Sequence, residues 1–196
     1  MKTESKTIDL LRHGQPVGGD VLRGRTDHEL SELGWSQMHE AVAEKKWDVI
    51  ITSPLSRCQA FSEKLAKQLD VELIIAPDFR EFDFGIWENQ SMDKIYKEDF
   101  ERIKPMWDDP MSFAAPEGES LLGFEKRILK AWFGCLARPE KSILVVCHGG
   151  VIRLLLKEIL GLPFNNINRF DVPFAARSQV KVTGQEPYYY QLMSHG

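Results

Sequence analysis

Two histidines follow short apolar segments and are the chain's best candidates for chemistry. His13 comes after residues 8–11 (IDLL), and His148 comes after residues 143–147 (ILVVC). Apolar runs of this length that end near glycine are typical of strands buried in a parallel sheet. Ligands of open α/β sheets bind at the carboxyl ends of the strands, so we expect both imidazoles to face one crevice. Histidine transfers protons or accepts a phosphoryl group near neutral pH.

Two arginines are expected at the same edge of the sheet. Arg12 precedes His13, and Arg57 lies in the first turn of a helix that Ser53 and Pro54 are predicted to begin. Taken singly, a histidine at a strand end or an arginine in a helix's first turn is more often structural or solvated. Together, these basic groups at the mouths of three strands need an anion between them. Guanidinium groups match phosphate oxygens well.

Strand-like and helix-like patterns alternate along the chain. Strands are expected at residues 8–11, 48–52, 71–75, 143–147, 180–182 and 188–190. Helices are expected at residues 31–46, 53–69, 124–136 and 151–160. This alternation predicts a three-layer α/β/α sandwich with a mostly parallel central sheet, in a single domain spanning residues 1–196.

Residues 86–120 differ from the rest, because they combine two tryptophans and three prolines with many charges. Helical spacing is present only around residues 95–103. We interpret the segment as an inserted helical lid over the carboxyl edge of the sheet, where specificity loops tend to lie. The alternative is a surface helical hairpin without a role in binding.

Composition limits the partners. The net charge of −4 argues against nucleic-acid binding, which favours a basic surface. No segment approaches the roughly 20 apolar residues of a membrane helix, and the first residues lack the apolar stretch of a secretory signal. Three cysteines without paired spacing are expected to be free thiols. We therefore expect a cytoplasmic protein with no membrane partner.

Five segments together resemble the histidine phosphatase superfamily, which includes the cofactor-dependent phosphoglycerate mutases. They read LLRHGQ (residues 10–15), LSELG (30–34), TSPLSRC (52–58), REFDFGIWE (80–88) and VCHGG (146–150). They follow the family's order and span nearly the whole chain. The resemblance implies a phosphotransfer enzyme.

The resemblance also implies a role for each motif residue. His13 would attack phosphorus and become a phosphohistidine. Arg12, Arg57 and His148 would hold the phosphoryl oxygens, where charge develops during transfer. Glu81 would protonate the leaving alkoxide and then deprotonate the water that releases phosphate.

Further residues near these motifs are candidates for substrate contacts. Gly149 is expected to bind substrate beside His148. Arg23 and Gly24 are expected to touch the phosphate or the rest of the substrate, the alternative for Arg23 being a solvent-facing loop arginine. The alternative for Glu81 is a surface carboxylate paired with Arg80. Glu88 is left outside the catalytic set.

Two departures from the family pattern bear on substrate. Gly19 stands six residues after His13, where many members have asparagine, and residues 116–120 read PEGES in place of PGGES. The first departure, with residues 22–24 (LRG) following, is most similar to the α-ribazole-5′-phosphate phosphatases of cobalamin biosynthesis. The 86–120 segment is shorter than the insertion of most mutases, which favours a hydrolase.

We therefore expect a metal-independent phosphatase without a cofactor that hydrolyses a small phosphomonoester, α-ribazole 5′-phosphate. The enzyme alternatives are a broad-specificity phosphatase of sugar phosphates or phosphoserine and a phosphoglycerate mutase. The non-enzyme alternative is a regulatory phosphate-binding domain. A zinc site formed by His13, His148 and Cys147 lacks ligand-like spacing. The oligomeric state stays open, with a homodimer as one alternative.

Overall fold

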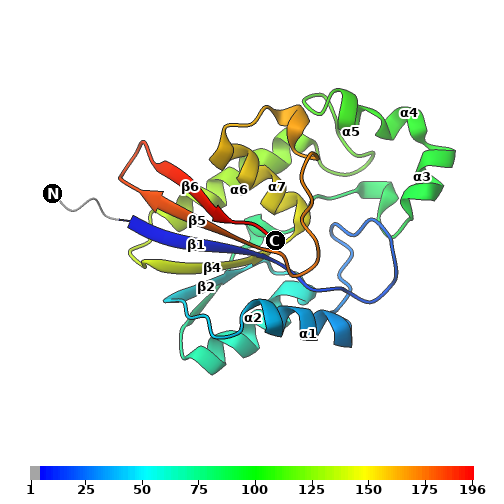
Figure 1. The fold of residues 1–196 in the computed structure, drawn as a ribbon. Helices are drawn as coiled ribbons and strands as arrows, with labels where there is room; N and C mark the ends of the chain where they lie inside the picture. The colour runs from blue at the N-terminus through cyan, green and yellow to red at the C-terminus, as the bar shows by residue number, and fades with distance from the viewer. Residues whose placement is uncertain (1–4) are drawn as a thin grey trace.

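Four parallel strands form the middle and one edge of a six-stranded sheet in the computed structural model, which describes residues 5–196 (Figure 1). The strand order is β3-β2-β4-β1-β5-β6. The parallel strands are β1 (Ser5–Arg12), β2 (Val49–Thr52), β3 (Glu72–Ile75) and β4 (Ser142–Cys147). Antiparallel strands β5 (Arg177–Thr183) and β6 (Tyr189–Ser194) complete the sheet. The predicted, mostly parallel sheet is confirmed.

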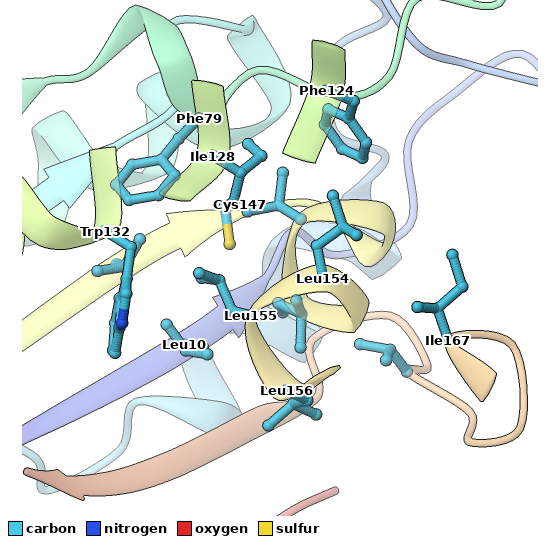
Figure 2. Close-up of a cluster of buried hydrophobic side chains, with 14 of the residues drawn as sticks. Leu10, Phe79, Phe124, Ile128, Trp132, Cys147, Leu154, Leu155, Leu156 and Ile167 are labelled. Carbon is cyan, nitrogen blue, oxygen red and sulfur yellow. The ribbon is translucent and has the colours of Figure 1, made fainter. Parts of the chain in front are cut away.

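Helices cover both faces of this sheet. One face carries α1 (Glu32–Ala41) and α2 (Ser56–Leu69), and the other carries α6 (Leu121–Leu136) and α7 (Gly149–Leu160), as Figure 1 shows. Successive strand residues alternate between two cores: Leu10 belongs to the core under α6 and α7, and Leu11 to the core over α1 and α2. Figure 2 shows the first of these cores. Burial on both faces explains the continuous apolar runs of β2 and β4 and confirms the three-layer sandwich.

Four helix boundaries differ from the sequence prediction: α6 begins at Leu121 rather than at residue 124, α7 begins at Gly149 rather than at residue 151, and the other two concern α1 and α2. The helix expected over residues 31–46 has the predicted N-cap, Ser31, but ends at Ala41. The helix expected to begin at Ser53 and Pro54 begins at Ser56. There the side chain of Asp27 accepts hydrogen bonds from the backbone N–H of Ser56 (2.7 Å) and from its hydroxyl. A carboxylate distant in sequence therefore stabilises this helix start.

The 86–120 segment consists mainly of short helices: η2 (Gly85–Trp87) leads into it, followed by α3 (Met92–Glu98), α4 (Phe100–Ile103) and α5 (Pro105–Asp108). Figure 1 shows them beyond the carboxyl ends of β1 and β4. The buried rings of Trp87 and Phe113 stack with centroids 6.2 Å apart and anchor the segment. None of the helices within residues 5–196 is long and apolar enough to cross a membrane.

Candidate active site

The two histidines meet because their strands are neighbours. In the parallel pair β1–β4, Arg12 is in register with Cys147, so the next residues, His13 and His148, leave the sheet together. Their ring centroids are 5.2 Å apart, and both side chains are buried. Strand β2 pairs with the other edge of β4 and brings Ser53 to the same end of the sheet.

His13 presents one unprotonated ring nitrogen. Its Nδ1 lies 2.8 Å from the carbonyl oxygen of Gly14, and a carbonyl only accepts, so Nδ1 carries the proton. Burial lowers the pKa of His13 well below 6.5, and the positive charges of Arg57 and Arg12 lower it further. The ring is therefore neutral near pH 7, and Nε2 keeps the lone pair that a nucleophile needs.

His148 has the opposite tautomer. Nε of Arg57 donates to its Nδ1 at 3.3 Å, so the ring proton lies on Nε2, which is 2.7 Å from the hydroxyl of Ser53. Burial lowers the pKa of His148 well below 6.5, with Arg57 and His13 adding to the shift. The Sγ of Cys58 lies 3.7 Å from Nε2, and burial raises the pKa of that thiol to about 12.

Arg57 is committed mainly to the protein itself. It is fully buried, and its Nη2 donates to the carbonyls of Arg23 (3.1 Å) and Gly24 (2.9 Å), while Nη1 donates to that of Thr26 (2.8 Å). With the bond to His148, four of the five N–H groups of a guanidinium are engaged. One N–H on Nη1 has no partner among the described residues.

A cavity of about 420 Å³ opens beside His13, and we call it the His13 cavity. Its lining includes Arg12, Glu81, Arg153 and Phe174, together with much of the 15–23 loop. Arg57 and His148 lie outside this lining. A larger cavity of about 490 Å³ lies around Lys6 and Arg138, at the far end of β1 from the histidines, so volume alone does not mark the site.

The side chain of Arg12 donates only one hydrogen bond to the residues that the structure describes. Its Nη1 donates to the carbonyl of Val172 at 2.5 Å, and its guanidinium carbon lies 4.2 Å from the ring centroid of Phe174. Its Nε is buried without a partner among the residues described. Burial lowers the pKa of Arg12 to about 10, although Glu81 opposes the shift, so the group is charged near pH 7. Buried donors without partners indicate a place for an anion.

Arg153 is a cavity residue that the sequence analysis missed. A Cβ on Gly149 would lie 3.2 Å from Nη1 of Arg153 and 3.4 Å from Nε of Arg12, so this glycine lets both guanidinium groups approach the start of α7. The Nε of Arg153 is also buried and has no partner within the described chain. Its ion pair with Asp171 is 3.9 Å long, and that carboxylate is 84% exposed. The available signal was a spacing of four residues from Gly149 in a helix that begins after the second histidine.

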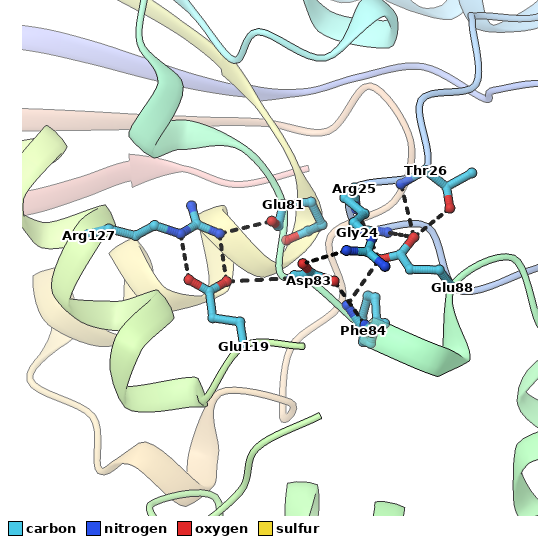
Figure 3. Close-up of polar contacts among 10 residues, drawn as sticks. Gly24, Arg25, Thr26, Glu81, Asp83, Phe84, Glu88, Glu119 and Arg127 are labelled. Atoms are coloured by element: carbon cyan, nitrogen blue, oxygen red, sulfur yellow. Dashed lines mark hydrogen bonds and ion pairs between the residues drawn. The ribbon is translucent and has the colours of Figure 1, made fainter. Parts of the chain in front are cut away.

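Glu81 lines the same cavity from a separate segment, and Figure 3 shows it beside Arg127 and Glu119. Its carboxylate accepts hydrogen bonds from the backbone N–H groups of Gly150 and Phe82, both at 3.0 Å. Arg127 donates to the carbonyl of Glu81 at 2.9 Å and forms an ion pair with Glu119 at 2.7 Å. Glu81 thus lies against the start of α7. The alternative of a carboxylate paired with Arg80 does not describe this contact.

The remaining predicted substrate residues have mainly internal contacts. Arg23 lines the His13 cavity, but its Nε donates to His28 and its Nη2 to the carbonyls of Val17 and Gly19. The N–H of Gly24 donates to a carboxylate and its carbonyl accepts from Arg57. Both backbone groups of Gly24 are therefore engaged within the protein. Within residues 5–196, no three His, Cys, Asp or Glu side chains gather as metal ligands.

Comparison with known proteins identifies relatives along nearly the whole chain. A family model described as "Histidine phosphatase superfamily (branch 1)" matches residues 8–193. The "Probable phosphoglycerate mutase GpmB" of Erwinia tasmaniensis is 30% identical over 180 residues, covering 88% of this chain and 83% of the relative.

Two solved structures have the same fold. A putative alpha-ribazole-5′-P phosphatase from Escherichia coli K-12 has 23% identity and a TM-score of 0.83, with coverage of 96% of this chain and 95% of its own. A mycobacterial glucosyl-3-phosphoglycerate phosphatase has 24% identity and a TM-score of 0.81, with coverage of 97% and 98%. At these identities the likeness concerns the fold.

Proposed function

Because the chain belongs to the histidine phosphatase superfamily, we propose that it is a phosphomonoester hydrolase that works through a phosphohistidine at His13. The observation that carries this proposal is the state of that side chain. It is neutral, its Nδ1 proton is held by Gly14, and it borders the His13 cavity together with Glu81. A nucleophile and a proton-transfer group facing one cavity are what a two-step phosphoryl transfer requires.

In the first step, Nε2 of His13 attacks phosphorus, a P–N bond forms and the bond to the leaving oxygen breaks. The unpaired donors of Arg12 stabilise the phosphoryl oxygens. The remaining N–H of Arg57 and the backbone N–H of Gly149 add to them, while His148, whose ring nitrogens are engaged with Arg57 and Ser53, holds Arg57 in place. Glu81 in its protonated form donates its proton to the leaving oxygen.

In the second step, Glu81 removes a proton from water as the water oxygen attacks phosphorus. The P–N bond breaks, its electron pair returns to Nε2, and inorganic phosphate leaves. Glu81 keeps the proton for the next substrate, so the cycle is balanced. The arginines supply the positive charge for both steps, and we therefore propose that no metal ion is needed.

For the leaving group we propose α-ribazole, released from its 5′-phosphate in the cytoplasm. The motif around Gly19 and the fold shared with a putative alpha-ribazole-5′-P phosphatase support this choice. A second candidate is phosphoglycerate mutase activity, favoured by the relative with 30% identity. A panel with α-ribazole 5′-phosphate, 3-phosphoglycerate, phosphoserine and sugar phosphates separates hydrolysis from isomerisation and ranks the leaving groups.

The decisive experiment is a rapid quench with radiolabelled substrate. Acid-labile, alkali-stable phosphate should be trapped on the protein, and His13→Ala should trap none and lose at least about 10³-fold in turnover. Activity should survive EDTA and be blocked by vanadate, which imitates five-coordinate phosphorus. Full activity of His13→Ala would exclude the phosphohistidine route. Loss on chelation that zinc or magnesium restores would overturn metal independence.

A further inference from the structure

Glu88 holds a concentrated set of hydrogen bonds outside the His13 cavity (Figure 3). Its carboxylate accepts from the backbone N–H groups of Gly24 (3.1 Å), Arg25 (3.0 Å) and Thr26 (2.9 Å). It also accepts from the hydroxyl of Thr26 (2.6 Å) and the N–H of Phe84 (3.0 Å). Burial by itself raises the pKa of Glu88, but these hydrogen bonds outweigh it and the pKa lies below its usual 4.5. The carboxylate is therefore ionised near pH 7.

The same backbone faces Arg57 on its other side. The carbonyls of residues 23, 24 and 26 accept from the guanidinium, while N–H groups of residues 24–26 point to Glu88. Peptide groups that present N–H to an anion and C=O to a cation are favoured by both charges, and such hydrogen bonds strengthen one another. The 23–26 backbone thus connects Glu88 to Arg57 although the two side chains are not hydrogen-bonded to each other.

Gly24 permits this close packing. A Cβ at position 24 would lie 1.8 Å from the carbonyl oxygen of Phe82 and 2.4 Å from Oε1 of Glu88. Backbone cannot move aside as a flexible side chain can, so any larger residue would push the 23–26 backbone away from Glu88. Gly24, which the sequence analysis placed in the substrate set, is required by this contact.

We propose that Glu88 is a positioning residue of the phosphoryl-transfer site, and that it acts through the 23–26 backbone on Arg57. Arg57 in turn fixes His148 through the 3.3 Å bond to Nδ1, and the ring of His148 packs against that of His13. Glu88 touches neither the cavity nor the reacting atoms. This inference rests on the proposed function for its effect on turnover, but the arrangement itself is open to measurement without a substrate.

A double-mutant cycle tests the proposal, with kcat/KM measured on p-nitrophenyl phosphate. Glu88→Gln places an amide where the loop N–H groups need an acceptor, and it should lower kcat/KM about ten- to hundredfold. In an Arg57→Lys background the same change should cost less than about threefold, because the guanidinium that Glu88 positions is already gone. An equal loss in both backgrounds would overturn the proposal.

Glu119→Gln is the matched control. Glu119 is also a partly buried carboxylate of this network, but it pairs with Arg127 and supports the Glu81 segment. The factor by which Glu119→Gln lowers kcat/KM should be the same in the wild-type and in the Arg57→Lys background. If Glu88→Gln does not fold, Thr26→Val removes only the hydroxyl donor at 2.6 Å and should show the same dependence on Arg57 with a smaller loss.

The ring nitrogen chemical shifts of His148 provide a readout that needs no catalysis. Glu88→Gln should change them and Glu119→Gln should not, with both variants retaining the wild-type thermal midpoint within a few degrees. Unchanged shifts in Glu88→Gln would refute the positioning role. Failure of the proposed function would be recognised separately, as hydrolysis that persists in His13→Ala.

Discussion

The two sides of His13 use their arginines in opposite ways. The inner region, which we define as Arg57, His148, Ser53 and residues 23–26, has four of the five guanidinium N–H groups engaged. The outer region, defined as Arg12, Arg153, Gly149 and Phe174, has two guanidinium groups whose Nε atoms lack partners in the part of the chain described. We infer that the inner region orients the imidazoles and the outer region binds the incoming anion.

Glu81→Gln should have the largest effect among variants that leave both regions intact. We expect a loss of about 10²–10⁴-fold on an alkyl phosphate, the usual contribution of one general acid. With p-nitrophenyl phosphate the leaving phenolate needs no proton, so formation of the phosphohistidine should be nearly normal. A burst of p-nitrophenol followed by slow turnover should be seen in stopped flow. The same loss on both substrates without a burst would exclude Glu81 as the acid.

Arg12→Met and Arg57→Met test the division between the regions directly. Arg12→Met should weaken binding of inorganic phosphate about a hundredfold, because its unpaired, charged donors each contribute about tenfold or more. Arg57→Met should lower kcat while weakening phosphate binding by about tenfold at most, since one of its N–H groups is free. Isothermal titration and steady-state kinetics measure the two quantities. Equal weakening of phosphate binding by both variants would remove the distinction.

Arg153→Met should have a smaller effect confined to binding. Loss of one outer charge is expected to raise KM about tenfold with kcat within about threefold of wild type. Arg102→Met is the control, because Arg102 is an exposed arginine that pairs with Asp99 on the 86–120 segment. An unchanged KM in Arg153→Met would show that Arg12 alone forms the outer region.

The smallest effect concerns stability. The folded chain lowers the pKa values of His13 and His148 below 6.5, so below about pH 6.5 the unfolded chain binds protons that the folded one excludes. The free energy of unfolding should therefore fall from pH 6.5 to pH 5, by at most about 1.4 kcal/mol per histidine per pH unit. The stabilisation that comes from the lowered pKa of Glu88 is complete above about pH 4.5, so Glu88 adds to the fall in the free energy of unfolding only below that pH. Urea titrations of wild type and His148→Asn should differ in this slope, and parallel slopes would contradict the burial argument.

The arrangement of strands and helices could be predicted from the sequence because strand patterns and motif order are local signals. The runs before His13 and His148 predicted two buried strands, and their pairing brings the imidazoles together. The predicted start of α2 was wrong by two residues, because the carboxylate that accepts from the N–H of Ser56, that of Asp27, is supplied by a loop nearly thirty residues away. Propensity and spacing hold no information about such a partner.

The role of each arginine was harder to predict than its location. Arg57 was correctly placed near His148, but its carbonyl partners lie on residues 23–26, and their orientation depends on Glu88. Arg153 was overlooked because an arginine inside a predicted helix is usually solvated. The role of Arg153 follows only from the packing of α7 against the 171–174 segment and against Glu81. Hydrogen-bond saturation is a property of the folded chain.

The position of β4 between β1 and β2 affects how the protein can fold during its synthesis. The two strands made first do not pair with each other: β2 can pair with β3 early, but β1 gains its first partner, and is joined to β2, only when residues 142–147 have been synthesised. The carboxyl edge that carries His13 is thus incomplete for most of translation. Sheet closure must wait for a late central strand, which is a slow, non-local event. We expect ribosome-bound chains that end before β4 to depend on chaperones, and His13 to acquire its neutral, buried state in one late step.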